Sequence, residues 1–211
     1  MDYTTLSLAA NVFAQFLASS PDAKTWQMLK KNHVLEEWFI HTQTPICEQG
    51  TMLWKRSHGE ESSDTIAADF TRLFLCDEEF LKAPPYASFY LESSGEIFTQ
   101  ESDDVQAVYD VFSFQTTRLT QEPADHIATQ LEFLSLLLKS AAQCDAFAKH
   151  ISQFIAIHLA PWMTSWTVDV QNNAQSLFYR GLGYHIQTYY ELLIETFQPN
   201  VVPRIIHRKA S

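Results

Sequence analysis

The chain has 211 residues, a formal net charge of −11, 46% hydrophobic residues and 18% charged residues. This balance excludes a disordered protein, and the acidic charge argues against a nucleic-acid phosphate backbone as partner. With five glycines in the chain, the composition favours an all-α protein over a sheet protein rich in tight turns. The three cysteines lack a CxxC pair, and neither a secretion signal nor an apolar run long enough for a membrane span is evident. These features predict a cytoplasmic protein that is not inserted in a membrane.

Apolar residues at helical spacing predict a series of modest helices in the first part of the chain. The expected ranges are 4–19, 22–31, 34–40, a helix opening at Pro45, and 66–75. The aromatic, proline-rich stretch from Ala83 to Tyr90 follows, and its start cannot be helical because of Pro84 and Pro85. Two interpretations of this stretch remain open: a loop packed onto the core, or one wall of an apolar binding site.

The next predicted helix is capped by Ser102-Asp103-Asp104 and runs to about Thr117. Its valines and its phenylalanine, at helical spacing, are expected to face inward. These are Val105, Val108, Val111 and Phe112.

The sequence Glu122-Pro123-Ala124-Asp125-His126 predicts a hinge that runs into a long helix from Pro123 to about Ala142. Pro123 suits a first helical turn, and the carboxylates of Glu122 and Asp125 favour the positive end of the helix dipole. Asp125 and His126 are neighbours about 100° apart on a helix, so they are unsuited to a hydrogen-bonded pair. The motif is either a well-capped helix alone or a surface that presents both side chains to another molecule.

The remaining chain predicts helices at 145–157, from Pro161 to Asn172, and from Leu177 to Phe197. Gly181 and Gly183 in the last helix indicate close helix packing. The residues from Gln198 onward, with their arginines and lysine, are expected to form a frayed basic end. The whole is predicted to be a bundle of nine to ten helices in two subdomains, 1–120 and 121–211, joined by a hinge near residues 118–124.

The sequence lacks three common catalytic and metal-binding motifs: HExxH, a glycine-rich phosphate loop and GxSxG. His150 and His158 lie eight residues apart without a third ligand nearby in the sequence. We therefore expect no cofactor, no metal and no enzymatic activity. The alternatives are an enzyme or nucleotide-binding bundle that uses Asp125 and His126, and an interaction module without peptide specificity.

Three motifs in one order resemble the TorD/DmsD family of redox-enzyme maturation chaperones. The first is Glu122-Pro123-Ala124-Asp125-His126-Ile127. The second joins Phe70-Thr71-Arg72-Leu73-Phe74 to the stretch from Pro84 to Leu91, and the third joins His158-Leu159-Ala160-Pro161-Trp162 to the stretch from Phe178 to Leu182. The resemblance covers roughly residues 65 to 195.

The resemblance implies an all-helical cytoplasmic chaperone that binds the twin-arginine signal peptide of a molybdenum-cofactor reductase. Such a chaperone holds the apo-reductase, of the trimethylamine N-oxide or dimethyl sulfoxide type, until its cofactor is inserted before export. The resemblance also allows a domain-swapped homodimer and weak nucleotide binding. The positions that it implies for peptide binding are Phe70, Leu73, Pro85, Tyr86, Glu122, Pro123, Asp125 and His126.

The residues themselves agree with this implication. A twin-arginine signal has a basic start and an apolar middle, which an acidic protein with an aromatic loop could complement. Asp125 is the expected charge contact. Tyr86, Phe70 and Leu73 are the expected apolar wall.

Overall fold

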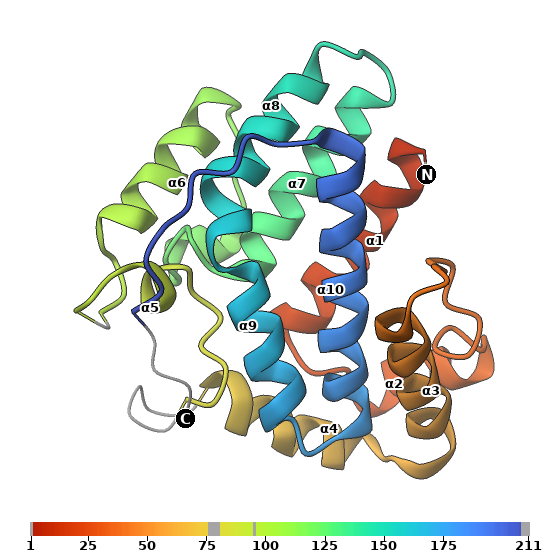
Figure 1. Cartoon of the computed structure of the whole chain (residues 1–211). Helices are drawn as coiled ribbons and strands as arrows, with labels where there is room; N and C mark the ends of the chain where they lie inside the picture. Colours follow the sequence, from red (N-terminus) through yellow and green to blue (C-terminus); the bar gives the residue numbers. More distant parts are fainter. Residues whose placement is uncertain (1, 76–80, 95, 208–211) are drawn as a thin grey trace. The chain divides into compact units, whose positions relative to one another are not determined.

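The computed structural model describes residues 2–75, 81–94 and 96–207, and within them the secondary structure is helical (Figure 1). The predicted all-α class is confirmed: the described residues contain ten α-helices, α1 to α10, and one isolated β-bridge. Among these helices, none combines the length and the apolar character that a membrane span requires.

The chain forms two compact units that differ from the expected subdomains. The first unit comprises Met1–Leu17, Pro85–Ser165 and Leu192–Ser211, and the second comprises Ala18–Pro84 and Trp166–Glu191. The expected boundary near residues 118–124 therefore falls inside the first unit. That this segment acts as a hinge stays a prediction.

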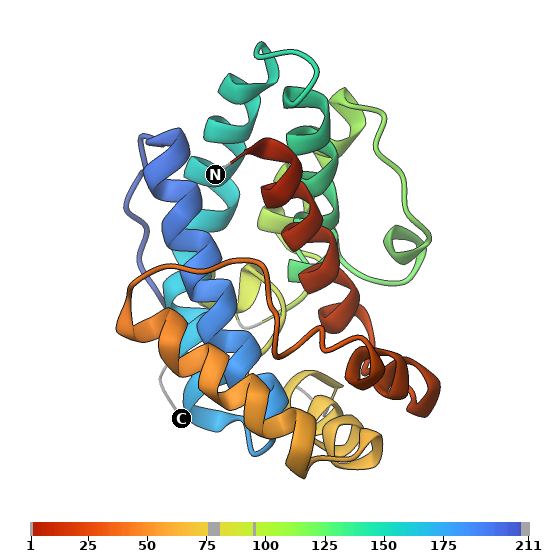
Figure 2. The ribbon, with the colours of Figure 1, turned by 90° about the vertical axis from the view of Figure 1, so that its right-hand side faces the viewer.

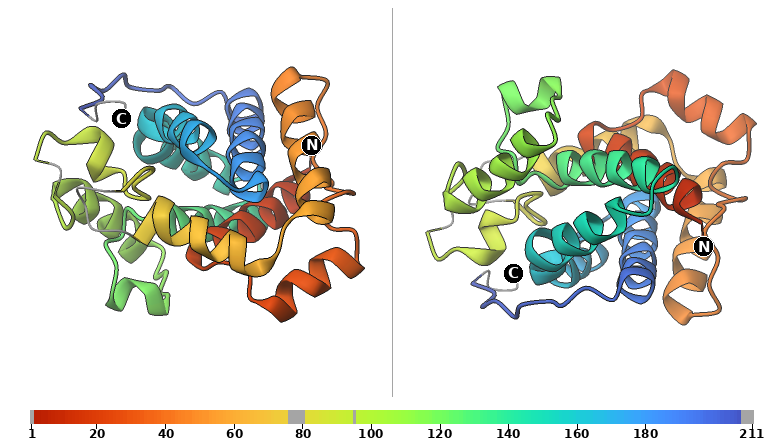
Figure 3. Two further views of the ribbon diagram at one scale, coloured as in Figure 1. Left: turned by 90° about the horizontal axis from the view of Figure 1, so that it is seen from below. Right: turned by 90° about the horizontal axis from the view of Figure 1, so that it is seen from above.

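The first unit is built around aromatic side chains of its central helix. Its helical elements are α1 (Tyr3–Ala18, up to Leu17), α5 (Ser88–Leu91), α6 (Gln100–Val111), η3 (Thr117–Thr120), α7 (Ile127–Ala141), α8 (Phe147–Phe154) and η4 (Ile155–Leu159). Phe133 of α7 is buried, and its ring lies 4.8 Å from that of Tyr109 and 4.9 Å from that of Phe154. The helices α1 and α7 run side by side, and the Ser7 hydroxyl donates to the Ser135 carbonyl at 2.8 Å (Figure 3, right).

The second unit contains α2 (Ala23–Lys31), α3 (Pro45–Glu60), α4 (Ser63–Phe70), η1 (Thr71–Leu75), and most of α9 (Ala160–Asn173) and α10 (Leu177–Phe197). The helices α3 and α10 pack closely (Figure 2). A Cβ at Gly181 would lie 2.5 Å from the Trp54 ring, whose indole N–H donates to the Phe178 carbonyl at 3.0 Å. The predicted packing role of Gly181 is confirmed.

Two predicted helices differ from the observed chain. Residues 34–40 are not helical but form turns, bends and irregular backbone, and the left-handed backbone of His33 (φ 53°) lies just after the end of α2. The helix α6 begins at Gln100 and ends at Val111, earlier than expected, and Ser113 follows with a φ of 51°. A positive φ cannot continue a right-handed helix, which explains both ends.

The expected helix break before Pro161 is not observed, because the chain stays helical from α8 into α9. Residues Ile155–Leu159 form a π-helical segment that leads directly into α9. Pro161 is the second residue of α9 and directly follows this π-helical segment.

The C-terminal tail is attached to the first unit, and the expectation of a frayed end is wrong for the described residues 198–207. Arg204 forms an ion pair with the buried Glu101, and the His207 N–H donates to the Tyr90 carbonyl at 2.9 Å. Figure 1 shows this segment running from the end of α10 towards α5.

Candidate functional site

The motif around Asp125 fastens the proline-rich loop to the start of α7. The Ile127 N–H donates to the Pro85 carbonyl at 2.8 Å, and the Ala87 N–H donates to the Asp125 carbonyl at 3.3 Å. Both partners lie in the first unit, so these contacts define a local geometry.

The Asp125 carboxylate is part of this fastening. It is fully buried, and its Oδ2 accepts the Ser88 N–H at 2.8 Å. Its Oδ1 has no hydrogen-bond partner among the described residues. Burial raises the pKa of Asp125; the bond from Ser88 opposes this rise, and Glu101 adds to it. The expectation that a surface presents Asp125 is therefore wrong.

His126 is the N-cap of α7, which begins at Ile127 and not at Pro123. Its Nδ1 accepts the Ala128 N–H at 3.1 Å, and the side chain is buried. Burial, with a further contribution from Arg118, lowers the pKa of His126 to about 3, so the ring is neutral near pH 7. The enzyme alternative needs an accessible acid or base, and neither Asp125 nor His126 is exposed in this way.

Tyr86 and Glu122 are the half-buried side chains of the same locus. Tyr86 forms an isolated antiparallel bridge with His126, and the two rings meet edge to face at 5.1 Å. Burial, then the nearby Glu122 and Asp125 carboxylates, raises the pKa of Tyr86 to about 12. Tyr86 is thus an aromatic group that lies beside two acidic groups.

The Glu122 carboxylate lacks a counter-ion partner for one of its oxygens. Its Oε2 is covered by protein, and no described residue forms a hydrogen bond with it. Burial raises the pKa of Glu122, and Arg118 partly opposes this rise. The guanidinium of Arg118 is itself paired with Glu132. Glu122 is therefore a partly desolvated acid that a further cation could neutralise.

The other predicted site residues belong to the packed interior. Pro85 and Pro123 are buried in the first unit. Phe70 and Leu73 belong to the second unit, where they are 6% and 0% exposed, and the Phe70 ring lies 5.8 Å from that of Tyr179. Phe70 and Leu73 therefore belong to a different unit from the other six predicted site residues, which are Pro85, Tyr86, Glu122, Pro123, Asp125 and His126.

The aromatic stretch that follows Pro84 is packed onto the core for most of its length, and its end forms the short helix α5. Phe89, Tyr90 and Leu91 are 8%, 1% and 5% exposed. Of the two interpretations of this stretch, the packed loop holds for these residues, and Tyr86 is the half-buried exception.

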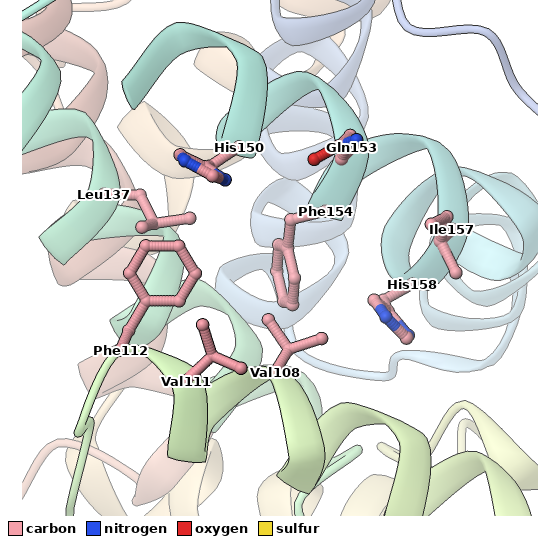
Figure 4. Close-up of a pocket in the computed structure, with 9 residues that line it drawn as sticks. All are labelled: Val108, Val111, Phe112, Leu137, His150, Gln153, Phe154, Ile157 and His158. Atoms are coloured by element: carbon pink, nitrogen blue, oxygen red, sulfur yellow. The ribbon is translucent and has the colours of Figure 1, made fainter. Parts of the chain in front are cut away.

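An apolar groove in the first unit was not predicted from the sequence (Figure 4). Its volume is ≈ 270 Å³. Side chains from α6, α7, α8 and η4, together with Phe112 after α6, line it: Val108, Val111, Phe112, Leu137, His150, Gln153, Phe154, Ile157 and His158.

Two of the exposed residues that line this groove are apolar. Val111 is 80% exposed and Ile157 is 51% exposed, although Val111 was expected to face inward. The apolar residues of α6 fit one helix face, so their spacing offered no signal that Val111 would be exposed.

Comparisons with known proteins agree with these observations. The family model described as the nitrate reductase delta subunit matches residues 41–168. The chaperone protein TorD of Vibrio parahaemolyticus is 29% identical over 121 residues, 54% of this chain and 55% of the relative. TorD of Actinobacillus succinogenes is 32% identical over 115 residues, with the same shares. The chain spans about half the length of these curated relatives.

A solved structure shares the fold. It is described as a redox enzyme maturation protein from Archaeoglobus fulgidus, with a TM-score of 0.53 and 17% identity. The match covers 92% of this chain and 94% of that one. Since the family model spans more than half of the sequence, this chain belongs to the nitrate reductase delta subunit family, and its TorD relatives confirm the resemblance to the TorD chaperones.

Proposed function

We propose that this protein is a cytoplasmic chaperone that matures a molybdenum-cofactor reductase and binds the twin-arginine signal peptide of that enzyme. It holds the apo-reductase until the cofactor is inserted, before export. The names of its TorD relatives and the acidic net charge of −11 support this proposal. A reductase of the trimethylamine N-oxide type is the proposed client ahead of the dimethyl sulfoxide type.

The observation that carries the proposal is the pair formed by Tyr86 and Glu122. Glu122 is a half-buried carboxylate with an unpartnered oxygen, and its pKa is raised by burial. Because Oε2 is covered, a guanidinium from the peptide would pair with the part of the half-buried Glu122 carboxylate that still reaches solvent, while its planar face could lie against the Tyr86 ring. In this arrangement Pro85, Asp125 and His126 are positioning residues, because they hold the Tyr86 segment against α7.

The apolar middle of the same peptide is assigned to the groove along α6 and α8. Its exposed rim residues, Val111 and Ile157, leave apolar surface in water, and an extended or helical apolar segment would bury it. The histidines and Gln153 at the groove give polar groups for the backbone of such a segment.

Calorimetry with a synthetic twin-arginine peptide tests the charge contact. Glu122→Gln keeps the shape of the side chain and removes its charge. We expect it to weaken binding by about tenfold, since a charge-assisted hydrogen bond contributes about 1.5–3 kcal/mol. Added salt should weaken the wild-type interaction and have less effect on the variant.

Glu195→Gln is the matched control, because Glu195 is an exposed acid of the same unit. It removes the same charge from the surface and should leave the affinity unchanged. If Glu122→Gln binds the peptide as tightly as the wild type, the charge contact lies elsewhere.

The groove has its own test. Val111→Glu places a charge on a highly exposed rim position, so the fold should persist while peptides with a full apolar segment bind more weakly. Val168→Glu makes the same change at an exposed valine outside the groove and should have no effect. Equal loss with a peptide that lacks the apolar segment would contradict the assignment.

The oligomer and the nucleotide remain separate parts of the proposal. A homodimer that exchanges the chain after residues 118–124 would have to release the Ala124 carbonyl from the Tyr109 hydroxyl, a bond of 3.0 Å. Size-exclusion chromatography with light scattering decides whether such a dimer forms. Equilibrium dialysis with a nucleotide decides whether weak nucleotide binding occurs.

A further inference from the structure

Two histidines and one glutamate converge in the second unit, outside the proposed peptide site. His33 follows α2, Glu36 lies in the turns after it, and His58 is in the last turn of α3. The two imidazole rings are stacked, with centroids 5.6 Å apart and planes inclined by 9°. All three residues lie within Ala18–Pro84, so the cluster belongs to a single unit.

The nitrogen and oxygen atoms that could bind a metal ion lie close together in these three side chains. The Nδ1 of His33 is paired with Oε2 of Glu36, and Nδ1 of His58 lies 3.6 Å from the same oxygen. The three donor atoms lie within 4.8 Å of one another. The Nδ1 of His58 is covered by protein, and it has no hydrogen-bond partner in the part of the chain that is described.

The backbone at His33 is a second observation. His33 occupies the position after the helix C-cap, where its N–H donates to the Lys30 carbonyl and the Val34 N–H donates to the Leu29 carbonyl. This pattern is the Schellman motif, whose left-handed residue is usually glycine because a side chain is strained there. The chain holds a histidine at this φ of 53° and aims its ring at the cluster.

From this geometry we propose that His33, Glu36 and His58 bind a divalent transition-metal ion, with Zn²⁺ as the best fit. Zinc takes imidazole nitrogen and carboxylate oxygen at about 2.0–2.2 Å, which sets tetrahedral ligand atoms about 3.4 Å apart. The separation of 3.6 Å between His58 and Glu36 already matches, and a small rotation of His33 would open its contact with the carboxylate. Three ligands leave a fourth position for water.

A metal ion here would join the turn after α2 to the end of α3. The bare alternative is a hydrogen-bonded pair of His33 and Glu36, in which the carboxylate raises the pKa of the histidine. The two differ in outcome, because only the metal site requires His58 as a ligand.

The test uses the full chain without a histidine tag. Zinc is titrated by calorimetry, and cobalt is titrated as a probe whose tetrahedral complexes absorb visible light. We expect one ion per chain and a rise of a few degrees in Tm at saturating zinc. Glu36→Gln and His58→Gln should each weaken zinc binding by roughly tenfold or more.

His33→Gly gives the sharpest result. Glycine removes the ligand and relieves the left-handed backbone, so the metal-free protein should keep or gain stability while the rise in Tm with zinc is lost. His207→Gln and Cys144→Ser are controls at exposed side chains of the first unit and should bind zinc as the wild type does. Absence of stoichiometric binding to the wild type, or undiminished binding to His58→Gln, would overturn the proposal.

Discussion

Two buried aspartates, one in each unit, fasten a loop to a helix in different ways. Asp69 in the second unit is 4% exposed, and its Oδ2 accepts the Gln175 N–H, the Ser176 N–H and the Ser176 hydroxyl at 3.0, 2.7 and 2.7 Å. Its Oδ1 pairs with Arg72 at 2.7 Å. Asp125 in the first unit is fully buried, but one of its oxygens has no partner among the residues described.

The two aspartates differ in whether both carboxylate oxygens have a partner: both do in Asp69, and one does not in Asp125 among the described residues. Oδ2 of Asp69 holds the turn between α9 and α10 and Oδ1 pairs with Arg72, so both oxygens have structural partners. Asp125 holds the segment that carries Tyr86, and burial raises its pKa. Buried polar groups that lack a partner are uncommon and often lie near functional sites. Of these two aspartates, Asp125 is therefore the one that marks a candidate functional segment.

The largest expected effect is at Asp69. Asp69→Ala should lower the free energy of unfolding by about 3–5 kcal/mol, because it strands Arg72 and three donors of the α9–α10 turn. Urea denaturation measures this loss. Asp64→Ala, at an exposed acid in the first turn of α4, is the control and should cost about 1 kcal/mol or less.

A smaller effect is expected at Asp125. Asp125→Ala should cost about 1–3 kcal/mol, since one backbone donor, Ser88, loses its acceptor. Asp125→Asn keeps an acceptor of the same shape, and its cost should be about 1 kcal/mol or less. If Asp125→Asn destabilised the protein as much as Asp69→Asn, the contrast between the two aspartates would disappear.

The neutral state of the buried His126 ring should make the free energy of unfolding about 1 kcal/mol larger at about pH 7 than at about pH 5.5. The pKa of His126 is about 3 in the folded chain against an ordinary value of 6.5. Between these values the unfolded chain binds a proton that the folded chain does not. The contribution of His126 to stability is therefore fully present above the ordinary pKa of 6.5, and it is lost as the pH falls towards the folded pKa of about 3.

His126→Asn isolates this contribution, because asparagine is also a good N-cap and does not titrate. From about pH 7 to about pH 5.5 the wild type should lose about 1 kcal/mol more stability than the variant. The raised pKa of Asp125 acts with the opposite sign and is present in both proteins. Equal pH profiles would show that the buried ring titrates normally.

The smallest effect on stability is expected at Glu122. Glu122→Gln should change the free energy of unfolding by about 0.5 kcal/mol or less, because Oε2 has no partner to lose within the described chain. Thermal unfolding checks this value. A large loss of unfolding free energy would show that Glu122 has a structural role, as Asp69 does.

The periodic spacing of apolar residues, together with capping residues and prolines, predicted the helical class and most of the helices. The helices near Tyr3, Ala23, Pro45 and Leu177 begin within a few residues of their expected starts, because apolar spacing, caps and prolines act locally. The start of α7 was misplaced, since Pro123 fits a first turn equally well. The helix starts later because Asp125 and Ile127 form backbone hydrogen bonds with the loop that contains Pro85, which is distant in the sequence.

The sites were harder to predict than the helices. Tyr86 and Glu122 were predicted to belong to one peptide-binding site only through the family resemblance. Burial of Asp125 depends on the contact with Ser88, which lies 37 residues away. The cluster of His33, Glu36 and His58 has no motif spacing, because its third member comes from a separate helix.

The attachment of Arg204 to Glu101 has a practical consequence for trimmed versions of the protein. Burial by itself raises the pKa of Glu101, but His158 and Arg204 together bring it below its ordinary value. A version cut back to Phe197 would strip the guanidinium from an acid with no access to water. Screens that shorten the chain to improve crystals or yield should therefore begin their deletions beyond His207.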